Sequence, residues 1–289
     1  MQLPEDKVII TVATTGGVVG TRERNPNVPE QPDEIAHAVY DCWKEGASIV
    51  HIHARDKNGI PTGDPAIYSE IHHKIRSLGC DIIIQDTTGT GPQVTPEDKI
   101  RCLEADPKPE MASLDMGTMI RNFGPYIGTG DHIYGKTLEA YAREMKAAGV
   151  KPSLEVFNPS HFREVKNLIA KGLVDKPYFV EFVLGQPYHG GMEATSKALF
   201  MFLFDLPEPQ DTFWSIMATG KQELPLTTIG MTLGGAIRVG FEDNLMYRKG
   251  EPAQSNAQIV ARSVRIAREL GKEPSTPNEA RKIIGLELR

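Results

Sequence analysis

Short runs of β-branched residues alternate with stretches of helical periodicity along the chain, and this alternation limits the fold more than any other feature. The first three runs are residues 8–12 (VIITV), 48–53 (SIVHIH) and 81–85 (DIIIQ). Each is followed by apolar residues at helical spacing. Five further candidate strands cover residues 111–114, 151–156, 178–184, 212–217 and 236–239. Nearly continuous apolar strands that alternate with helices predict a parallel sheet covered by helices.

Eight such units favour a closed (β/α)8 TIM barrel over an open, doubly wound α/β sheet. The connection after the first strand, residues 14–31, also lacks the G-x-G-x-x-G turn of a dinucleotide site in an open sheet. We therefore expect a single TIM-barrel domain over residues 1–289. Its C-terminal helices, from about residue 255 to 289, are expected to pack on the barrel or on a neighbouring subunit.

Composition excludes several classes of function. The chain has 32 basic and 38 acidic residues, a net charge of −6 and no block of basic residues, so nucleic acid is not expected as a partner. No apolar run reaches the roughly 20 residues of a membrane span. Cys42, Cys80 and Cys102 have no CxxC spacing and are expected to be reduced and buried. The first residues have neither a cationic start nor an apolar core, so a secretory signal is not expected. These features predict a cytoplasmic protein that acts on small molecules.

His51 and His53 lie at the end of the second predicted strand. Because side chains alternate across a strand, residues i and i+2 point to the same face and both imidazoles can reach one cation. A buried histidine is often only a hydrogen-bonded core residue, but this pair at a strand end favours a metal site.

The C-terminal ends of barrel strands meet at one mouth, so residues distant in sequence can share a site. A catalytic zinc ion takes three His or carboxylate ligands and keeps one open position, and Glu242 after the eighth strand is the expected third ligand. Arg238, within that strand, needs an anionic partner if buried, and Asp243 is available as its partner and as a base. Pairing with Arg238 is expected to lower the pKa of Asp243. The alternatives are a solvated acidic pair at Glu242 and Asp243, and a purely structural Arg238–Asp243 bridge.

Other polar residues are expected at the same mouth. Hydroxyl groups and exposed N–H groups after the strands are suited to hold a substrate carboxylate. The candidates are Thr15, Thr87, Thr88, Gly89, Ser113 and Glu155. His72 and His73, by contrast, are adjacent in a helical stretch and are predicted to lie on the surface.

Several longer motifs occur in order along nearly the whole chain. They include TVATTGG (11–17), HIHARD (51–56), PEMAS (109–113), FVLG (182–185) and GGAIRVGFEDN (234–244). Together they resemble the β-keto acid cleavage enzymes, a family that includes 3-keto-5-aminohexanoate cleavage enzyme. The His-x-His and Arg-x-Gly-Phe-Glu-Asp-Asn segments are the most specific parts of this resemblance.

The resemblance implies a zinc-dependent TIM-barrel transferase that condenses a 3-oxo acid with acetyl-CoA. The implied products are acetoacetyl-CoA and a shorter product, formed by a retro-Claisen route. At matching positions it implies His51, His53 and Glu242 as zinc ligands and Asp243 as the base, poised by Arg238. It further implies that Thr87 and Ser113 hold the substrate and that the protein is a homo-oligomer, a tetramer.

Val18 departs from the pattern of the 3-keto-5-aminohexanoate enzyme, which resembles this chain but has an acidic residue in the first loop to meet the substrate ammonium. An apolar side chain cannot neutralise an amine in a closed site. We therefore expect Val18 to contact a 3-oxo acid that lacks a cationic amine at that point.

Two other functions remain open from the sequence. A metal-dependent hydrolase of the amidohydrolase type also places His-x-His in a barrel, but it needs further histidine ligands after strands five and six, and strand five here ends in Glu155. A non-catalytic barrel that binds metal or CoA is the second alternative. Acetyl-CoA-dependent consumption of a 3-oxo acid would distinguish the transferase from both.

Overall fold

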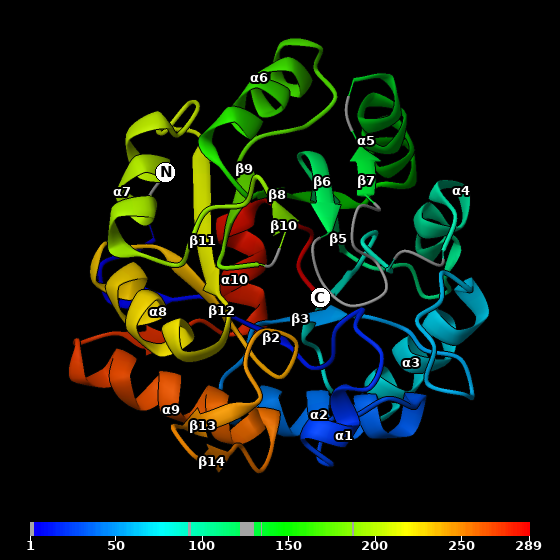
Figure 1. Cartoon of the computed structure of the whole chain (residues 1–289), viewed down its shortest axis with the longest axis vertical. Coiled ribbons are helices and arrows are strands. Elements are labelled where there is room, and N and C mark those ends of the chain that lie inside the picture. The colour runs from blue at the N-terminus through cyan, green and yellow to red at the C-terminus, as the bar shows by residue number, and fades with distance from the viewer. Residues whose placement is uncertain (1–2, 92–93, 122–129, 134, 187) are drawn as a thin grey trace.

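Eight parallel strands form a closed barrel surrounded by helices (Figure 1). The computed structural model describes residues 3–91, 94–121, 130–133, 135–186 and 188–289. In chain order the barrel strands are β2 (Ile10–Ala13), β3 (Ile49–Ile52), β4 (Ile83–Asp86), β5 (Met111–Asp115), β8 (Lys151–Val156), β9 (Tyr178–Leu184), β11 (Thr212–Ala218) and β12 (Ala236–Val239). β12 pairs with β2 and closes the barrel. The predicted (β/α)8 fold is therefore confirmed.

Helices surround the barrel. They are α1 (Thr21–Arg24), α2 (Pro32–Glu45), α3 (Pro65–Ser77), α4 (Pro96–Lys99), α5 (Lys136–Ala148), α6 (Phe162–Ala170), α7 (Ser196–Asp205), α8 (Glu223–Thr232), α9 (Asn256–Glu269) and α10 (Pro277–Ile284). Of these, α3, α4, α7, α9 and α10 begin at a residue whose side chain caps the first turn. Short 3-10 turns are η1 (Ile100–Glu104), η3 (Pro159–His161) and η4 (Gly220–Gln222). α2 and α10 both start with proline in the first turn and a capping box, which satisfies amide groups that the helix cannot pair.

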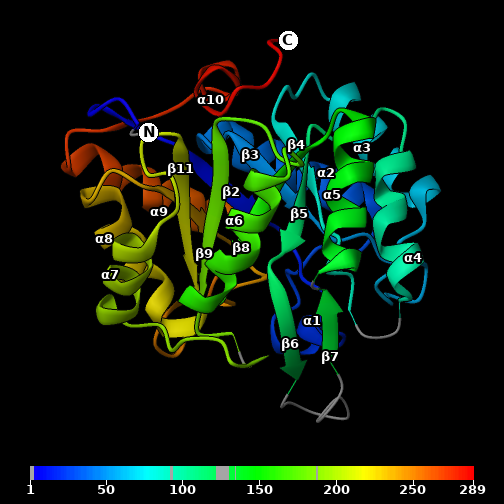
Figure 2. The same cartoon turned by 90° about the horizontal axis from the view of Figure 1, so that it is seen from above.

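Strand residues alternate between the helix-covered outside and the inside of the barrel. On β9, Val180 and Phe182 pack in the main core against the helices, whereas Phe179 belongs to a second cluster inside the barrel. This second cluster also contains Ala280 and Ile284 of α10. α10 therefore closes the N-terminal end of the barrel with apolar side chains, as Figure 2 shows at the end opposite β6 and β7.

Short strands outside the barrel were not predicted. β6 (Gly117–Arg121), β7 (Gly130–Ile133) and β10 (Tyr188–His189) form a small sheet, and β13 (Met246–Arg248) pairs with β14 (Glu251–Pro252) as a hairpin. At the other end β1 (Lys7–Val8) pairs with β15 (Glu273–Pro274). Cys42, Cys80 and Cys102 are free and buried, as expected. Within the described ranges, none of the helices has the length and hydrophobicity of a membrane span.

Candidate active site

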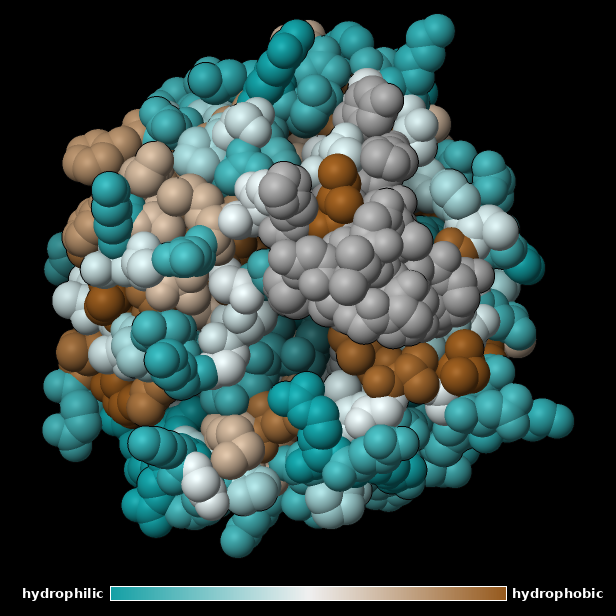
Figure 3. All heavy atoms as spheres, viewed as in Figure 1, coloured by the Kyte–Doolittle hydropathy of each residue, from teal (hydrophilic) through white to brown (hydrophobic). Residues whose placement is uncertain are grey.

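A cavity of about 990 Å³ opens at the C-terminal ends of the barrel strands. Its lining residues on the strands and on the loop after β12 include the buried His51, His53, Glu155 and Arg238 and the half-buried Glu242. Figure 3 shows the face of the molecule that carries this opening. The mouth predicted from strand polarity therefore exists, and it is large enough for a ligand much bigger than a short keto acid.

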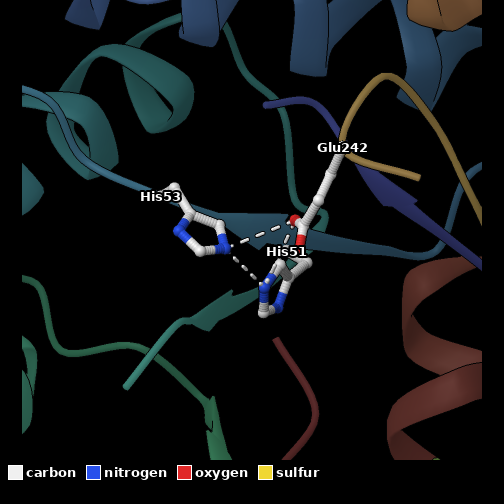
Figure 4. Close-up of side chains that lie close together, drawn as sticks. All are labelled: His51, His53 and Glu242. Carbon is white, nitrogen blue, oxygen red and sulfur yellow. Dashed lines mark hydrogen bonds and ion pairs between the residues drawn. The ribbon is translucent and has the colours of Figure 1, made fainter. Parts of the chain in front are cut away.

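His51, His53 and Glu242 converge on one point at the base of this cavity (Figure 4). The two Nε2 atoms of His51 and His53 lie 3.3 Å apart. Glu242 Oε2 lies 3.6 Å from Nε2 of His51 and 3.4 Å from Nε2 of His53. The three expected ligand atoms thus form a nearly equilateral triangle.

The protonation of this cluster suits a cation. His51 Nδ1 donates to Gln85 Oε1 at 3.1 Å, so its Nε2 presents a lone pair to Glu242. Burial, and then the charge of Arg238, lower the pKa of His51 to about 3, which keeps the imidazole neutral. Within the described residues, His53 Nδ1 and Glu242 Oε2 are buried without hydrogen-bond partners. An unpartnered carboxylate oxygen beside two imidazole nitrogens is an arrangement that a metal ion would satisfy.

The size of the triangle gives an independent test of this fit. Ligand atoms about 2.0–2.1 Å from a tetrahedral zinc ion lie about 3.3–3.4 Å from one another. The observed separations of 3.3, 3.4 and 3.6 Å match this geometry. The residues present therefore fit a three-ligand site of the catalytic type, with donors that zinc accepts.

Arg238 is the centre of a buried cluster of four carboxylates. Its guanidinium lies 2.6 Å from Glu242, 3.1 Å from Glu181 and 3.6 Å from Glu155, and it donates to both oxygens of Asp243 at 3.0 and 3.1 Å. Four ionised carboxylates around one guanidinium would leave three uncompensated negative charges in a buried space, which is costly. A divalent cation bound by His51, His53 and Glu242, which we call the triad, would offset two of these negative charges.

The pKa shifts follow from this charge balance. Although burial opposes ionisation, the Arg238 guanidinium lowers the pKa of Glu242. Burial raises the pKa of Glu155, Glu181 and Asp243 above the usual carboxyl range despite the opposing effect of Arg238. Pairing with Arg238 lowers the pKa of Asp243, as expected, but burial and then the charge of Glu242 outweigh this effect, so the net shift is upward.

The predicted substrate-binding residues fall into two groups, those that line the cavity and those that do not. Thr87, Gly89, Val18 and Glu155 line the cavity. The remaining three, Thr15, Thr88 and Ser113, are buried and are not among the lining residues. Thr88 Oγ1 donates to the carbonyl oxygen of Ser113 at 2.8 Å, and the Ser113 hydroxyl accepts from the Thr88 amide at 3.2 Å. Thr88 and Ser113 thus fix the loop after β4 onto β5.

Arg55 holds the loop that follows β2, and sequence reasoning missed it. Its side chain is fully buried, and it donates to the carbonyl oxygens of Gly59 at 2.7 Å, Gly16 at 2.5 Å and Val18 at 2.9 Å. One guanidinium therefore fixes the backbone that places Val18 at the cavity. An arginine two residues after a His-x-His pair was the available signal.

Glu223, at the start of α8, holds the loop between β12 and β13. Its carboxylate accepts from the Gly240 amide at 3.3 Å, from Asn244 Nδ2 at 3.4 Å and from Arg262 Nη2 at 3.2 Å. This loop carries Glu242, so the glutamate on α8 and the arginine on α9 position a residue of the triad.

His72 is buried, so the prediction that it lies on the surface is wrong. Its Nε2 lies 3.0 Å from Asp86 Oδ1, and its Nδ1 contacts the carbonyl oxygen of Pro107 at 2.7 Å. His73 is exposed, as predicted. Only one of two adjacent helical residues can face the core, and Asp86 at the end of β4 supplied the polar partner that made burial of His72 possible.

Comparison with known proteins identifies the family. The sequence profile of the beta-keto acid cleavage enzymes matches residues 7–286. The chain belongs to the beta-keto acid cleavage enzyme family. It is 37% identical over 284 residues to the 3-keto-5-aminohexanoate cleavage enzyme of Acetoanaerobium sticklandii, covering 97% of this chain and 99% of that protein. It is 32% identical over 302 residues to the 3,5-dioxohexanoate:acetyl-CoA acetone transferase of Paraburkholderia graminis, covering 97% and 96%.

Solved structures of other proteins support the fold of this member of the beta-keto acid cleavage enzyme family. A binary complex of ObcA with oxaloacetate superposes with a TM-score of 0.74 at 18% identity, over 91% of this chain and 68% of that chain. The expected family and the expectation of an enzyme are thus confirmed. Family membership also favours the transferase over the hydrolase and the non-catalytic barrel.

Proposed function

We propose that this protein is a zinc-dependent β-keto acid cleavage enzyme that condenses a 3-oxo acid with acetyl-CoA. The observation that carries the proposal is the triangle of His51, His53 and Glu242 beside Arg238 and Asp243 at the base of the cavity. The names of two family relatives, an acetone transferase and 3-oxoadipate:acetyl-CoA acetyltransferase of Cupriavidus necator, include acetyl-CoA. They support the choice of co-substrate.

Each residue has a distinct role in the proposed reaction. His51, His53 and Glu242 hold the zinc ion, which when bound supplies Lewis-acid polarisation of the keto oxygen. Asp243 lines the cavity and takes a proton from the carbon between the keto and carboxyl groups. Each Asp243 oxygen accepts one hydrogen bond from Arg238 and keeps a second lone pair for that proton. Thr87 and Gly89 line the cavity, and the Thr87 hydroxyl, which accepts from the Gly89 amide at 2.9 Å, would donate its proton to the substrate carboxylate.

Atom balance decides which product carries CoA. The carbanion attacks the acetyl carbonyl of the thioester, a carbon–carbon bond forms and CoA leaves as a thiolate. The condensed acid then has two keto groups, the original one and the former acetyl carbonyl. Attack of the CoA thiolate on the former acetyl carbonyl only regenerates acetyl-CoA and the starting 3-oxo acid. Attack on the original keto carbon breaks its bond to the central carbon and leaves a CoA thioester of the remaining acyl group. The central carbon takes back the proton held by Asp243, and acetoacetate is released. This balance revises the expectation of acetoacetyl-CoA as the product.

Val18 limits the substrate in this proposal. Its side chain lines the cavity, and Arg55 fixes its carbonyl oxygen. An ammonium group that meets this apolar, half-exposed side chain would gain no counter-ion from it. We therefore propose a 3-oxo acid that has no cationic amine at that position. Turnover of 3-keto-5-aminohexanoate as fast as that of simple 3-oxo acids would refute this restriction, and Val18→Glu is expected to increase the rate with the amino substrate.

The main test measures acetyl-CoA-dependent consumption of a panel of 3-oxo acids by the zinc-loaded protein. His51→Ala is expected to lose zinc and activity. Asp243→Asn is expected to keep zinc and fold but to lose about 10²–10⁴-fold in rate, as for removal of a catalytic base. The matched control Asp41→Asn changes an exposed acid outside this cavity and should leave the rate unchanged. A folded, zinc-bound Asp243→Asn protein with full activity would exclude Asp243 as the base.

Assembly and location complete the proposal. We propose a cytoplasmic homotetramer, on the basis of the family resemblance. Light scattering coupled to size-exclusion chromatography measures the mass directly, and a monomer of 31.9 kDa would contradict it.

A further inference from the structure

The charges that line the cavity are separated by sign. The acidic lining residues Asp115, Glu155, Glu242 and Asp243 lie at the ends of the strands and on the loop after β12, and the last three surround Arg238. The other lining cations lie on α1, on η4, on the β13–β14 hairpin and on α9, and all of them except the buried Arg262 are exposed. They are Arg24, Lys221, Arg248, Lys249 and Arg262. In a chain with a net charge of −6, this basic opening is a local exception to the overall charge.

Three of these cations have no counter-ion of their own. Arg262 pairs with Glu223 at 3.2 Å, and Arg248 pairs with Glu251. Arg24, Lys221 and Lys249 are exposed, and none of them makes an ion pair or side-chain hydrogen bond with any residue that the structure describes. We define these three residues as the basic rim.

The basic rim comes from three separate segments of the chain. Arg24 ends α1, Lys221 lies in η4 before α8, and Lys249 is in the turn of the β13–β14 hairpin. Because all three line one cavity, their positive potentials add at its opening. A ligand with several negative charges would therefore be attracted to the opening and repelled from the acidic base.

The cavity volume has room for such an extended ligand. At about 990 Å³ it is at the upper end of the range for small-molecule sites. A short 3-oxo acid needs only the part near Arg238. The rest of the cavity connects that part to the basic rim, so it can hold a long neutral linker between a reacting group and an anionic end.

We propose that Arg24, Lys221 and Lys249 bind the phosphate groups of the CoA thioester, with its acyl end at the base of the cavity. This inference rests on the proposed function, because it assigns a subsite to the proposed co-substrate. CoA carries a diphosphate and a 3′-phosphate on its nucleotide end and a neutral pantetheine arm that leads to sulfur. That charge distribution is complementary to a cavity with a cationic rim and a reaction centre below it.

The first test measures binding of CoA itself to the zinc-loaded protein by calorimetry, so that catalysis is not required. Lys221→Glu and Lys249→Glu are each expected to weaken binding of CoA by about tenfold at low salt and to reduce its salt dependence. The control Lys166→Glu makes the same change on the exposed side of α6, outside the lining of the cavity, and should not alter binding. Dephospho-CoA, which lacks the 3′-phosphate, should bind more weakly to the unchanged protein.

The second test compares acetyl-CoA with acetyl-pantetheine, which lacks the phosphorylated nucleotide. The rim variants are expected to raise KM for acetyl-CoA about tenfold and to leave kcat and the kinetics with acetyl-pantetheine unchanged. Activity with unchanged KM for acetyl-CoA in both rim variants would overturn the subsite but not the proposed function. Charge-dependent binding of CoA without turnover of any 3-oxo acid would refute the proposed function and leave the subsite in place.

Discussion

Gly240 allows the loop that carries Glu242 and Asp243 to pass directly over the end of β2. Its φ is +135°, a conformation that residues with a side chain rarely adopt. A Cβ atom at this position would lie 3.0 Å from the nitrogen and carbonyl carbon of Ala13 and closer still to its oxygen. Ala13 ends a barrel strand that is paired on both sides, and its oxygen accepts from the Glu242 amide at 3.2 Å. The backbone therefore has little freedom to move away.

The cost of Gly240→Ala has two separate parts. Backbone strain at a positive φ costs about 1–3 kcal/mol. Steric overlap with a fixed neighbour adds about 1–3 kcal/mol. We expect the free energy of unfolding to fall by about 2–6 kcal/mol, together with weaker zinc binding, because the loop and Glu242 must shift.

Gly250→Ala separates these two parts. Gly250 also has a positive φ, +79°, but a Cβ there would meet no atom within 4 Å. Gly250→Ala should therefore lower the free energy of unfolding only by the cost of backbone strain. Urea unfolding followed by circular dichroism gives the free energy of each variant, and chelator competition gives zinc affinity. If Gly240→Ala is no less stable than Gly250→Ala and binds zinc as tightly as the parent protein, the reasoning from close approach is refuted.

Three further predictions concern single side chains. Gly16→Ala would place Cβ 2.7 Å from Glu242 Cγ, so zinc affinity should fall about 10–100-fold with little loss of stability, as a chelator titration would show. His72→Ala should cost about 3–5 kcal/mol in urea unfolding because it leaves Asp86 buried alone; a similar loss in His72→Ala/Asp86→Ala would disprove this reason. Burial lowers the pKa of Lys151 to about 8, so Lys151→Met should stabilise the fold below pH 8, with the gain vanishing as pH approaches the unfolded pKa of about 10.4. Thermal unfolding across this pH range measures it.

The barrel was predictable because its signal is local. Each barrel strand falls on a short apolar run, including the weak run at residues 212–217, which forms β11. The residues of the triad were predictable for a related reason, since strand polarity places all C-terminal ends at one mouth. The choice of ligands depended on alternation along β3 for the two histidines, and for Glu242 on its place after the last barrel strand together with the family resemblance.

Glu181 shows what sequence reasoning missed at the site itself. It lies in the middle of the apolar run that forms β9, and alternation places it on the same face as Phe179, which points into the barrel. A lone acid at an inward position should have suggested a buried cation on another strand, and Arg238 is that cation, 3.1 Å away. The signal was present, but it required reading the inward face of two strands together.

The basic rim and the contacts of Arg55 could not be predicted in the same way. Both depend on how loops of different lengths fold over the barrel mouth, and loop conformation is not set by the two-residue period of strands. Lys221 and Lys249 are ordinary exposed lysines until the structure shows that they line one opening.

The position of α10 has a consequence for synthesis of the chain. This helix follows all eight barrel strands in the sequence, yet its Ala280 and Ile284 cover the apolar end of the barrel. Arg281 of the same helix also reaches back to Glu110, before β5, at 2.6 Å. Before α10 has been synthesised, the strands can already be outside the ribosome with that end uncovered. We expect nascent chains stalled before α10 to be bound by chaperones and cleaved by proteases, and emergence of α10 to end both.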